Sequence, residues 1–217
     1  MPSRIDPALI PDSPNLQIEQ ALWDAGIRRI AGIDEAGRGA LAGPVAASAV
    51  ILPPRRSVER ELEEVRDSKE MTPAQRESWS RRIREIAWAW GVGFASPAEI
   101  DALRIVPATR LAAQRALANL SVSPEHLLLD YLFLNDIPQP QTSLIKGDMR
   151  SLSIAAASVL AKTSRDALLV ELGDKYPGYG FAGNKGYGTR SHREAIERLG
   201  PSRLHRFSFA PMRSIAD

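Results

Sequence analysis

The pattern of apolar and polar positions divides the first half of the chain into strands and helices. Two apolar runs, 28–33 and 44–52, flank a glycine-rich stretch, which predicts a β-hairpin. Thr72 precedes Pro73, and a glutamine follows three residues after that threonine, which predicts the N-terminus of a helix reaching the tryptophans near residue 90. The segment "WGVGFAS" at 90–96 predicts a third strand.

In the second half, strands and helices alternate. Short apolar runs at 126–130 and 142–148 predict two buried strands, each ending in an acid. The helical segments that we expect are 97–103, 107–120, 151–176 and 189–199. A hairpin-linked strand group, followed by helices and then by alternating strands and helices, predicts an α/β fold with a central mixed β-sheet flanked by helices.

The domain organisation follows from length and local composition. A chain of 217 residues, 44% hydrophobic and 25% charged, suits one domain with a small appendage. Residues 1–27, rich in proline and aspartate near their start, predict a flexible N-terminal arm. We expect a main domain over 28–176, and a glycine- and aromatic-rich loop with a small helical appendage over 177–217.

Composition excludes several kinds of chemistry. The chain has no cysteine, which excludes disulfides, thiolate zinc sites and a cysteine nucleophile. No apolar run is long enough to cross a membrane, and the start of the chain does not resemble a secretory signal, so we expect a cytoplasmic protein. Net charge is +2, but residues 184–217 carry seven Lys or Arg against three Asp or Glu. Basic clustering of this kind favours contact with a nucleic-acid backbone.

Four acids share one setting in the pattern. Asp34, Glu35, Asp130 and Asp148 each lie at or just past the end of an apolar, strand-like run. Such acids are commonly turn formers or helix caps, and that alternative stays open for each acid taken singly. If the four converge at one sheet edge, they repel one another unless divalent cations neutralise them. Oxygen-only ligation favours Mg²⁺ or Mn²⁺, and two such ions about 4 Å apart catalyse phosphoryl chemistry.

Several blocks of the sequence resemble one enzyme family, in order. "GIDEAGRGALAGPV" resembles the opening motif of ribonuclease HII, and "DSK" at 67–69 resembles the next one. "LLLDYL", "KGDMRSLSIAAASVLAKTSRD" and "YPGYGFAGNKGYGTRSHREAIERLG" resemble the remaining blocks. Together they cover nearly all of residues 28–213, and the ordered set is far more specific than any single motif.

The resemblance implies a ribonuclease H-like fold and a metal-dependent endoribonuclease. It implies hydrolysis of the RNA strand of RNA–DNA hybrids and nicking on the 5′ side of single ribonucleotides in duplex DNA, which leaves 3′-hydroxyl and 5′-phosphate ends. Ribonucleotide excision repair and primer removal use such cuts. The implied cofactor is Mg²⁺ or Mn²⁺, held by Asp34, Glu35, Asp130 and Asp148 as catalytic and metal-binding acids. We expect the chain to act as a monomer.

The same resemblance implies the residues that read the substrate. The Gly37-Arg38-Gly39 turn would contact the ribonucleotide and its 2′-hydroxyl, and Tyr187 would lie at the ribonucleotide–deoxyribonucleotide junction. Without the resemblance, the turn reads as an ordinary glycine hairpin. A further set of polar residues, each of which is commonly a solvated surface group, is expected to contact phosphates: Lys69, Lys146, Lys185, Arg190, His192, Arg206 and Ser208.

The chain departs from the family pattern at two places. Tyr131 follows the third acid where the family usually has glycine, and Val106–Pro107 replaces a segment that often carries asparagine and a non-proline residue. Neither change removes an acid, so both bear on local loop shape.

Two alternative functions remain at this point. One is another two-metal nuclease of the same superfamily, against which the small-residue helix and the glycine turn argue. The other is a non-catalytic nucleic-acid-binding module, which has no need of four converging acids, because they repel phosphate in the absence of metal.

Overall fold

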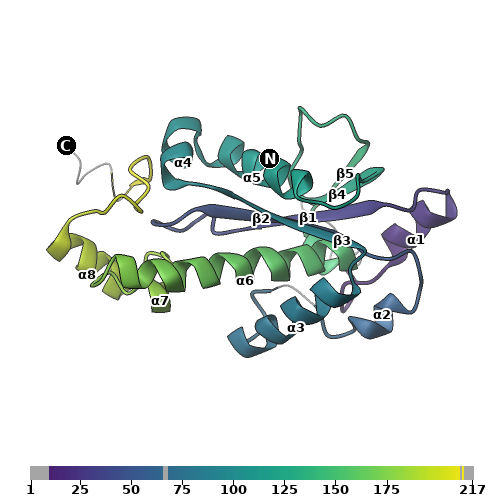
Figure 1. Cartoon of the computed structure of the whole chain (residues 1–217), viewed down its shortest axis with the longest axis horizontal. Helices are drawn as coiled ribbons and strands as arrows, with labels where there is room; N and C mark the ends of the chain where they lie inside the picture. The colour runs from purple at the N-terminus through teal and green to yellow at the C-terminus, as the bar shows by residue number, and fades with distance from the viewer. Residues whose placement is uncertain (1–9, 66–67, 211, 213–217) are drawn as a thin grey trace.

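The computed structural model describes residues 10–65, 68–210 and 212 of the chain. A five-stranded sheet with strand order β3-β2-β1-β4-β5 forms the centre (Figure 1). β1 (Ile30–Ala36) is antiparallel to β2 (Val45–Ile51), which is antiparallel to β3 (Ala89–Ala95). On its other side β1 is parallel to β4 (His126–Asp130), which is parallel to β5 (Gln141–Leu144). The predicted mixed sheet and its hairpin are confirmed.

Helices cover both faces of this sheet (Figure 1). α6 (Leu152–Lys175) lies along one face, and α3 (Pro73–Ile86) packs against α6 on the outside. α5 (Ile105–Ala118), preceded by α4 (Pro97–Leu103), covers the other face. No helix in the part of the chain that the structure describes is long and apolar enough to cross a membrane.

The first half of α6 lies close to the sheet because its residues are small. Ala155, Ala156 and Ala157 are all fully buried. A small side chain lets the helix backbone approach a strand closely, and the buried apolar atoms then stabilise both elements. This contact places α6 directly beneath β1.

Local capping determines where two helices begin. The Thr72 hydroxyl accepts a hydrogen bond from the Gln75 backbone N–H, and the Gln75 side chain accepts one from the Thr72 N–H. Ser96 and Glu99 form the same reciprocal pair at the start of α4. These capping boxes satisfy N–H groups that a helix N-terminus otherwise leaves unpaired.

The N-terminal region differs from the flexible arm that the sequence predicts. Residues 1–9 lie outside the described part, but α1 (Gln17–Asp24) is helical and packed. Glu19 is 1% exposed; its Oε1 accepts hydrogen bonds from Ser151 Oγ at 2.6 Å and from the Ser153 backbone N–H at 3.0 Å. The prediction is therefore wrong from Leu16 to Asp24, because contacts with a segment 130 residues away order this helix.

The C-terminal elements form a lobe at the far end of α6 (Figure 1). α7 (Phe181–Asn184) is a single turn within the predicted loop, and α8 (Arg190–Leu199) matches the predicted helix. Their apolar cluster includes Leu41 and Leu169, so the lobe packs on the hairpin loop and on α6. One further helical turn, α2 (Val58–Glu61), lies between β2 and α3.

Candidate active site

Two of the four acids are neighbours on adjacent strands. Ile33 of β1 pairs with Leu129 of β4, so the residues that follow them, Asp34 and Asp130, lie side by side at the same edge of the sheet. Asp34 lies within β1 rather than beyond its end, because that strand continues to Ala36. Its carboxyl group is buried on the α6 face, where the nearby Ser158 hydroxyl acts to lower the pKa of Asp34.

The fourth acid, Asp148, lies on a tight turn and not at the end of a strand. β5 ends at Leu144, and Lys146 adopts a left-handed conformation with φ 55° before the 3₁₀ turn η2 (Gly147–Met149). The Gly147 N–H donates to Asp130 Oδ1 at 2.7 Å, which holds this turn beside the third acid. Asp148 is therefore buried next to Asp130, and its Oδ2 lies 3.4 Å from Lys69 Nζ.

The electrostatics show that the four carboxyl groups share one environment. Burial raises the pKa of Asp34 well above its usual value, and Glu35, Asp130 and Asp148 raise it further through like charge. Burial, followed by the charge of Asp148, raises the pKa of Asp130 to about 6. A buried cluster of like charges is costly unless a cation compensates it.

The donor chemistry of this cluster fits a divalent cation. All four side chains offer carboxylate oxygens, the ligands that Mg²⁺ and Mn²⁺ prefer. Each acid also has its own partner: Glu35 pairs with Arg38 at 3.0 Å, and the partners of Asp130 and Asp148 are given above. Among residues 10–65, 68–210 and 212, no three His, Cys, Asp or Glu side chains are already arranged as a metal cage. The arrangement is thus a carboxylate cluster and not a preformed metal cage.

The glycine turn and Tyr187 open onto the same pocket as three of the acids. Its lining includes Asp34, Glu35 and Asp130 together with the 37–39 turn and Tyr187. The segment after the glycine turn also touches the segment before Tyr187, because the Gly186 carbonyl accepts hydrogen bonds from the N–H groups of Leu41 at 2.8 Å and Ala42 at 3.1 Å. The structure therefore brings together segments that are about 150 residues apart.

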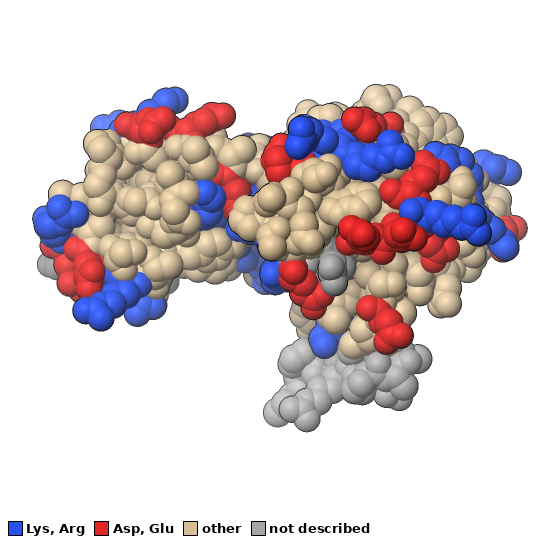
Figure 2. Space-filling view, turned by 90° about the horizontal axis from the view of Figure 1, so that it is seen from below, with Lys and Arg blue, Asp and Glu red and all other residues tan. Residues whose placement is uncertain are grey.

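The exposed basic candidates lie around this pocket and on the C-terminal lobe. The Lys69 side chain is 75% exposed and lines the pocket, and Lys146 is exposed on the turn before Asp148. Lys185 is partly exposed beside Tyr187, and Arg190 is exposed on α8, where it pairs with Glu194 at 2.8 Å. Figure 2 shows acidic and basic side chains interspersed on one face rather than a continuous basic stripe.

The other three candidate phosphate contacts are buried or half-buried. Arg206 is fully buried and donates to the backbone carbonyls of Gly43 at 3.0 Å and Arg38 at 2.9 Å, so it supports the glycine turn from inside. His192 is fully buried, with Nδ1 2.9 Å from the Tyr187 carbonyl oxygen. Ser208 is half-buried, and its backbone N–H donates to Asp101 Oδ1. The expectation that Arg206 and His192 are surface contacts is wrong.

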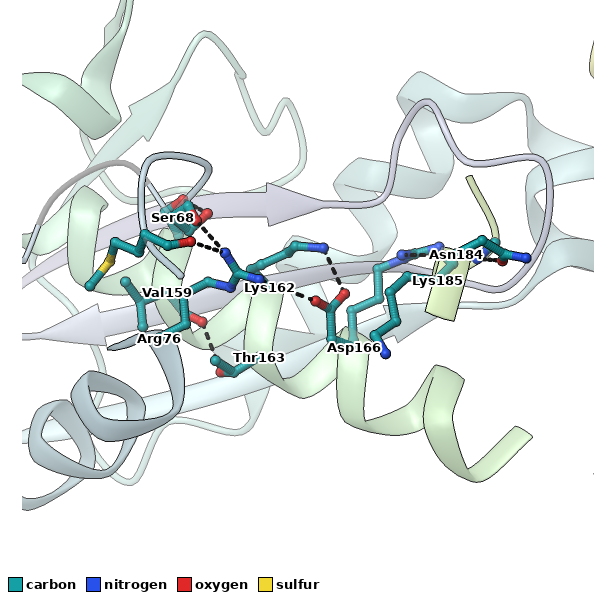
Figure 3. Close-up of polar contacts among 12 residues, drawn as sticks. Ser68, Arg76, Val159, Lys162, Thr163, Asp166, Asn184 and Lys185 are labelled. Atoms are coloured by element: carbon teal, nitrogen blue, oxygen red, sulfur yellow. Dashed lines mark hydrogen bonds and ion pairs between the residues drawn. The ribbon is translucent and has the colours of Figure 1, made fainter. Parts of the chain in front are cut away.

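Arg76 and Lys162 line the pocket but were not singled out from the sequence, whereas Asp166 was considered either as an electrostatic aid to the site or as part of a helix-surface salt bridge. Figure 3 shows Arg76, Lys162 and Asp166 converging between α3 and α6. Lys162 Nζ lies 2.7 Å from Asp166 Oδ1, and Arg76 donates to the Ser68 carbonyl at 2.9 Å, beside Lys69. The i,i+4 spacing of Lys162 and Asp166 was the only signal in the sequence, because the partners of Arg76 depend on how two distant helices pack.

Comparison with known proteins identifies the family. The family model described as Ribonuclease HII matches residues 31–212. Ribonuclease HII of Synechococcus sp. (strain JA-3-3Ab) is 55% identical over 202 residues, which is 93% of this chain and 90% of the relative. Ribonuclease HII of Moorella thermoacetica is 51% identical over 88% of this chain and 91% of the relative. The chain belongs to the ribonuclease HII family.

Solved structures of the ribonuclease H type share the fold. Ribonuclease H2 from Pyrococcus horikoshii OT3 has a TM-score of 0.71 and 25% identity over 86% of this chain and 96% of that one. RNase HII from Archaeoglobus fulgidus, solved in complex with PCNA, has a TM-score of 0.68 and 26% identity over 85% and 96%. This chain is therefore a ribonuclease H, a metal-dependent endonuclease, and the non-catalytic alternative is set aside.

Of the two departures from the ribonuclease HII pattern, one lies in a loop and the other in the first turn of a helix. Tyr131 adopts φ 45°, a left-handed conformation that glycine reaches without strain, and its side chain is 57% exposed. Its N–H donates to the Leu144 carbonyl at 2.9 Å, so the neighbouring Asp130 stays next to β5. Pro107 lies in the first turn of α5, where a missing N–H costs no helical hydrogen bond.

Proposed function

We propose that this ribonuclease H nicks duplex DNA on the 5′ side of a single embedded ribonucleotide and also cleaves the RNA strand of RNA–DNA hybrids, leaving 3′-hydroxyl and 5′-phosphate ends. One observation carries the proposal: a single pocket is lined by three of the acids, by the 37–39 turn and by Tyr187. The acids proposed for catalysis and the residues proposed to bind the sugar thus line the same cavity. Such cuts serve ribonucleotide excision repair and primer removal.

Asp34, Glu35, Asp130 and Asp148 would hold two Mg²⁺ or Mn²⁺ ions. When bound, such ions activate a water molecule and stabilise the leaving 3′-oxygen. The burial and mutual repulsion of the acids support this role, and the fold neighbour Bst-RNase HIII was solved with Mn²⁺. The protein's own part is to hold the carboxylates at one sheet edge, with Lys69 beside Asp148.

The backbone of the 37–39 turn and Tyr187 would read the ribose. A 2′-hydroxyl distinguishes RNA from DNA at a given position. A site that hydrogen-bonds a hydroxyl rejects the analogue that lacks it by roughly 10⁴-fold or more, because its polar groups are then left unpaired. Arg38 is held towards Glu35, so the turn lies directly beside the acids.

The exposed cations would bind phosphates on either side of the cut. Lys69 lines the pocket, Lys146 is exposed on the turn before Asp148, and Lys185 and Arg190 lie on the C-terminal lobe. Phosphate contacts position a duplex without reading its sequence. We further propose that the enzyme acts as a monomer on DNA in the cytoplasm.

Three end-labelled duplexes of one sequence test the proposal: all-DNA, one ribonucleotide, and one strand entirely RNA. Each is incubated with Mg²⁺, Mn²⁺ or EDTA, and the cut position is mapped at nucleotide resolution. We expect no cleavage of DNA alone or in EDTA, and a single cut immediately 5′ of the ribonucleotide. Cleavage confined to runs of ribonucleotides, or a cut on the 3′ side, would contradict it.

A further inference from the structure

Arg165, in the second half of α6, is buried without a carboxylate partner within hydrogen-bonding distance in the described part of the chain. Its side chain is 0% exposed. The guanidinium donates three hydrogen bonds to backbone carbonyls: Nε to Pro44 at 2.9 Å, Nη2 to Ala42 at 3.1 Å and Nη1 to Lys185 at 2.9 Å. Burying a charge is costly, so a guanidinium that is satisfied by carbonyls alone indicates a specific structural task.

The three carbonyls come from two separate segments. Ala42 and Pro44 follow the glycine turn in the loop between β1 and β2, and Lys185 lies two residues before Tyr187. The rigid, planar guanidinium group of Arg165 therefore joins the segment that carries the turn to the segment that carries the tyrosine. Lysine cannot reproduce this, because its single ammonium lies on a flexible stem.

The guanidinium also contacts both recognition elements directly. A Cβ atom built on Gly37, where φ is +90°, would lie 1.9 Å from Arg165 Nε, so only glycine leaves room for the side chain beneath the turn. On the other side, Arg165 Cζ lies 5.3 Å from the centre of the Tyr187 ring, within the range of a cation–π contact.

We propose that Arg165 is a positioning residue that fixes the distance between the 37–39 turn and Tyr187, and thereby sets the preference for a ribonucleotide. The inference rests on the proposed function, because the two elements it joins are the proposed ribose-reading elements. Arg165 does not touch the substrate. It acts by keeping two loops from separate parts of the chain in one geometry, so a 2′-hydroxyl meets both at once.

The test compares Arg165→Lys with the wild type in binding. Fluorescence anisotropy in Ca²⁺, without Mg²⁺ or Mn²⁺, measures affinity for two DNA duplexes that differ by one ribose 2′-hydroxyl. We expect Arg165→Lys to reduce the preference for the ribonucleotide duplex at least tenfold, while affinity for the all-DNA duplex changes less than twofold. Arg115→Lys is the matched control, because Arg115 also donates to a backbone carbonyl, that of Phe94, and lies on α5 instead. A folded Arg165→Lys that keeps the wild-type preference overturns the inference.

A measurement on the wild type keeps the test decisive if the variant does not fold. Hydrogen–deuterium exchange follows the backbone amides of 37–43 and 185–188 with each duplex bound. We expect the ribonucleotide duplex to slow exchange in both segments together, and slowing in only one of them overturns the inference. A wild type that shows no preference between the duplexes refutes the proposed function itself, so the two failures are distinct.

Discussion

A Cβ atom built on Gly32 of β1 would lie 2.2 Å from the carbonyl carbon of Ser153, at the start of α6. Strand and helix backbones are thus in direct contact, two residues before Asp34. Because backbone cannot move aside as a side chain can, Gly32→Ala must push α6 away from the sheet.

We expect Gly32→Ala to lower the free energy of unfolding by about 3 kcal/mol, the upper end of the cost of overpacking a core. Urea denaturation followed by circular dichroism measures the change. Gly39→Ala is the control, because nothing lies within 4 Å of a Cβ at that position. Equal stability of the two variants would contradict the close contact between β1 and α6.

Asp130→Asn is expected to abolish cleavage and to change the pH dependence of stability. The folded-state pKa of Asp130 is about 6, against an ordinary value of 3.8. Between about pH 4 and pH 6 the folded wild type binds a proton that the unfolded chain has released, so its stability falls as pH rises through this window. The variant lacks this penalty and should gain most in Tm above pH 6, and nothing below pH 4.

Thermal unfolding in EDTA across pH 4–8 measures this difference. Asp136→Asn provides the control, because it removes the same charge from an exposed acid in the following loop, outside the acid cluster. A variant at Asp130 that retains near-native turnover in Mg²⁺ would remove this residue from the site.

The strands, most helices and the four acids could be predicted from the sequence, because apolar periodicity and the ordered motifs are local signals. The burial of Arg206 could not, since its acceptors at Gly43 and Arg38 lie some 165 residues away in the chain. In a sequence, a cluster of basic residues predicts an exposed surface, and only the fold shows which of those side chains are buried. The ordered α1 was missed for the same reason, because Glu19 finds its partners at the start of α6.

The two arginines expected on the basic tail differ in exposure, so their substitutions should have different effects. Arg190→Glu should weaken binding of every duplex alike and flatten its salt dependence, because the Arg190 side chain is 93% exposed. Arg206→Ala should instead lower stability by about 3 kcal/mol, since buried carbonyls lose their donor. Salt titrations of binding and urea denaturation distinguish the two, and a stable Arg206→Ala with weakened binding would contradict this assignment.

Tyr187→Ala should lower activity on a single-ribonucleotide duplex more than on a continuous hybrid. One ribonucleotide offers a single productive register, whereas a hybrid offers several. Initial rates on both substrates give the ratio, for which we expect a change of about tenfold, the order expected for the loss of one aromatic contact. Equal losses on both substrates would show that Tyr187 does not act at the junction.

Tyr131→Gly should stabilise the protein by about 0.5–1 kcal/mol, because it relieves a left-handed conformation that a Cβ makes unfavourable. Tyr131→Ala keeps the Cβ and is the control, which should show no gain. Denaturant midpoints compare the two variants, and a gain shared by both would assign the effect to the exposed ring instead.

Helix α6 sets the spacing between the acid cluster and the 37–39 turn. Ser158, whose hydroxyl lies near Asp34, and Arg165, which lies beneath the glycine turn, are seven residues apart on this helix. Seven residues span about 10 Å and close to two turns, so both side chains leave the same side of the helix. One inserted residue would swing Arg165 by about 100° around the axis and away from the turn. The interval from 158 to 165 therefore has one workable length.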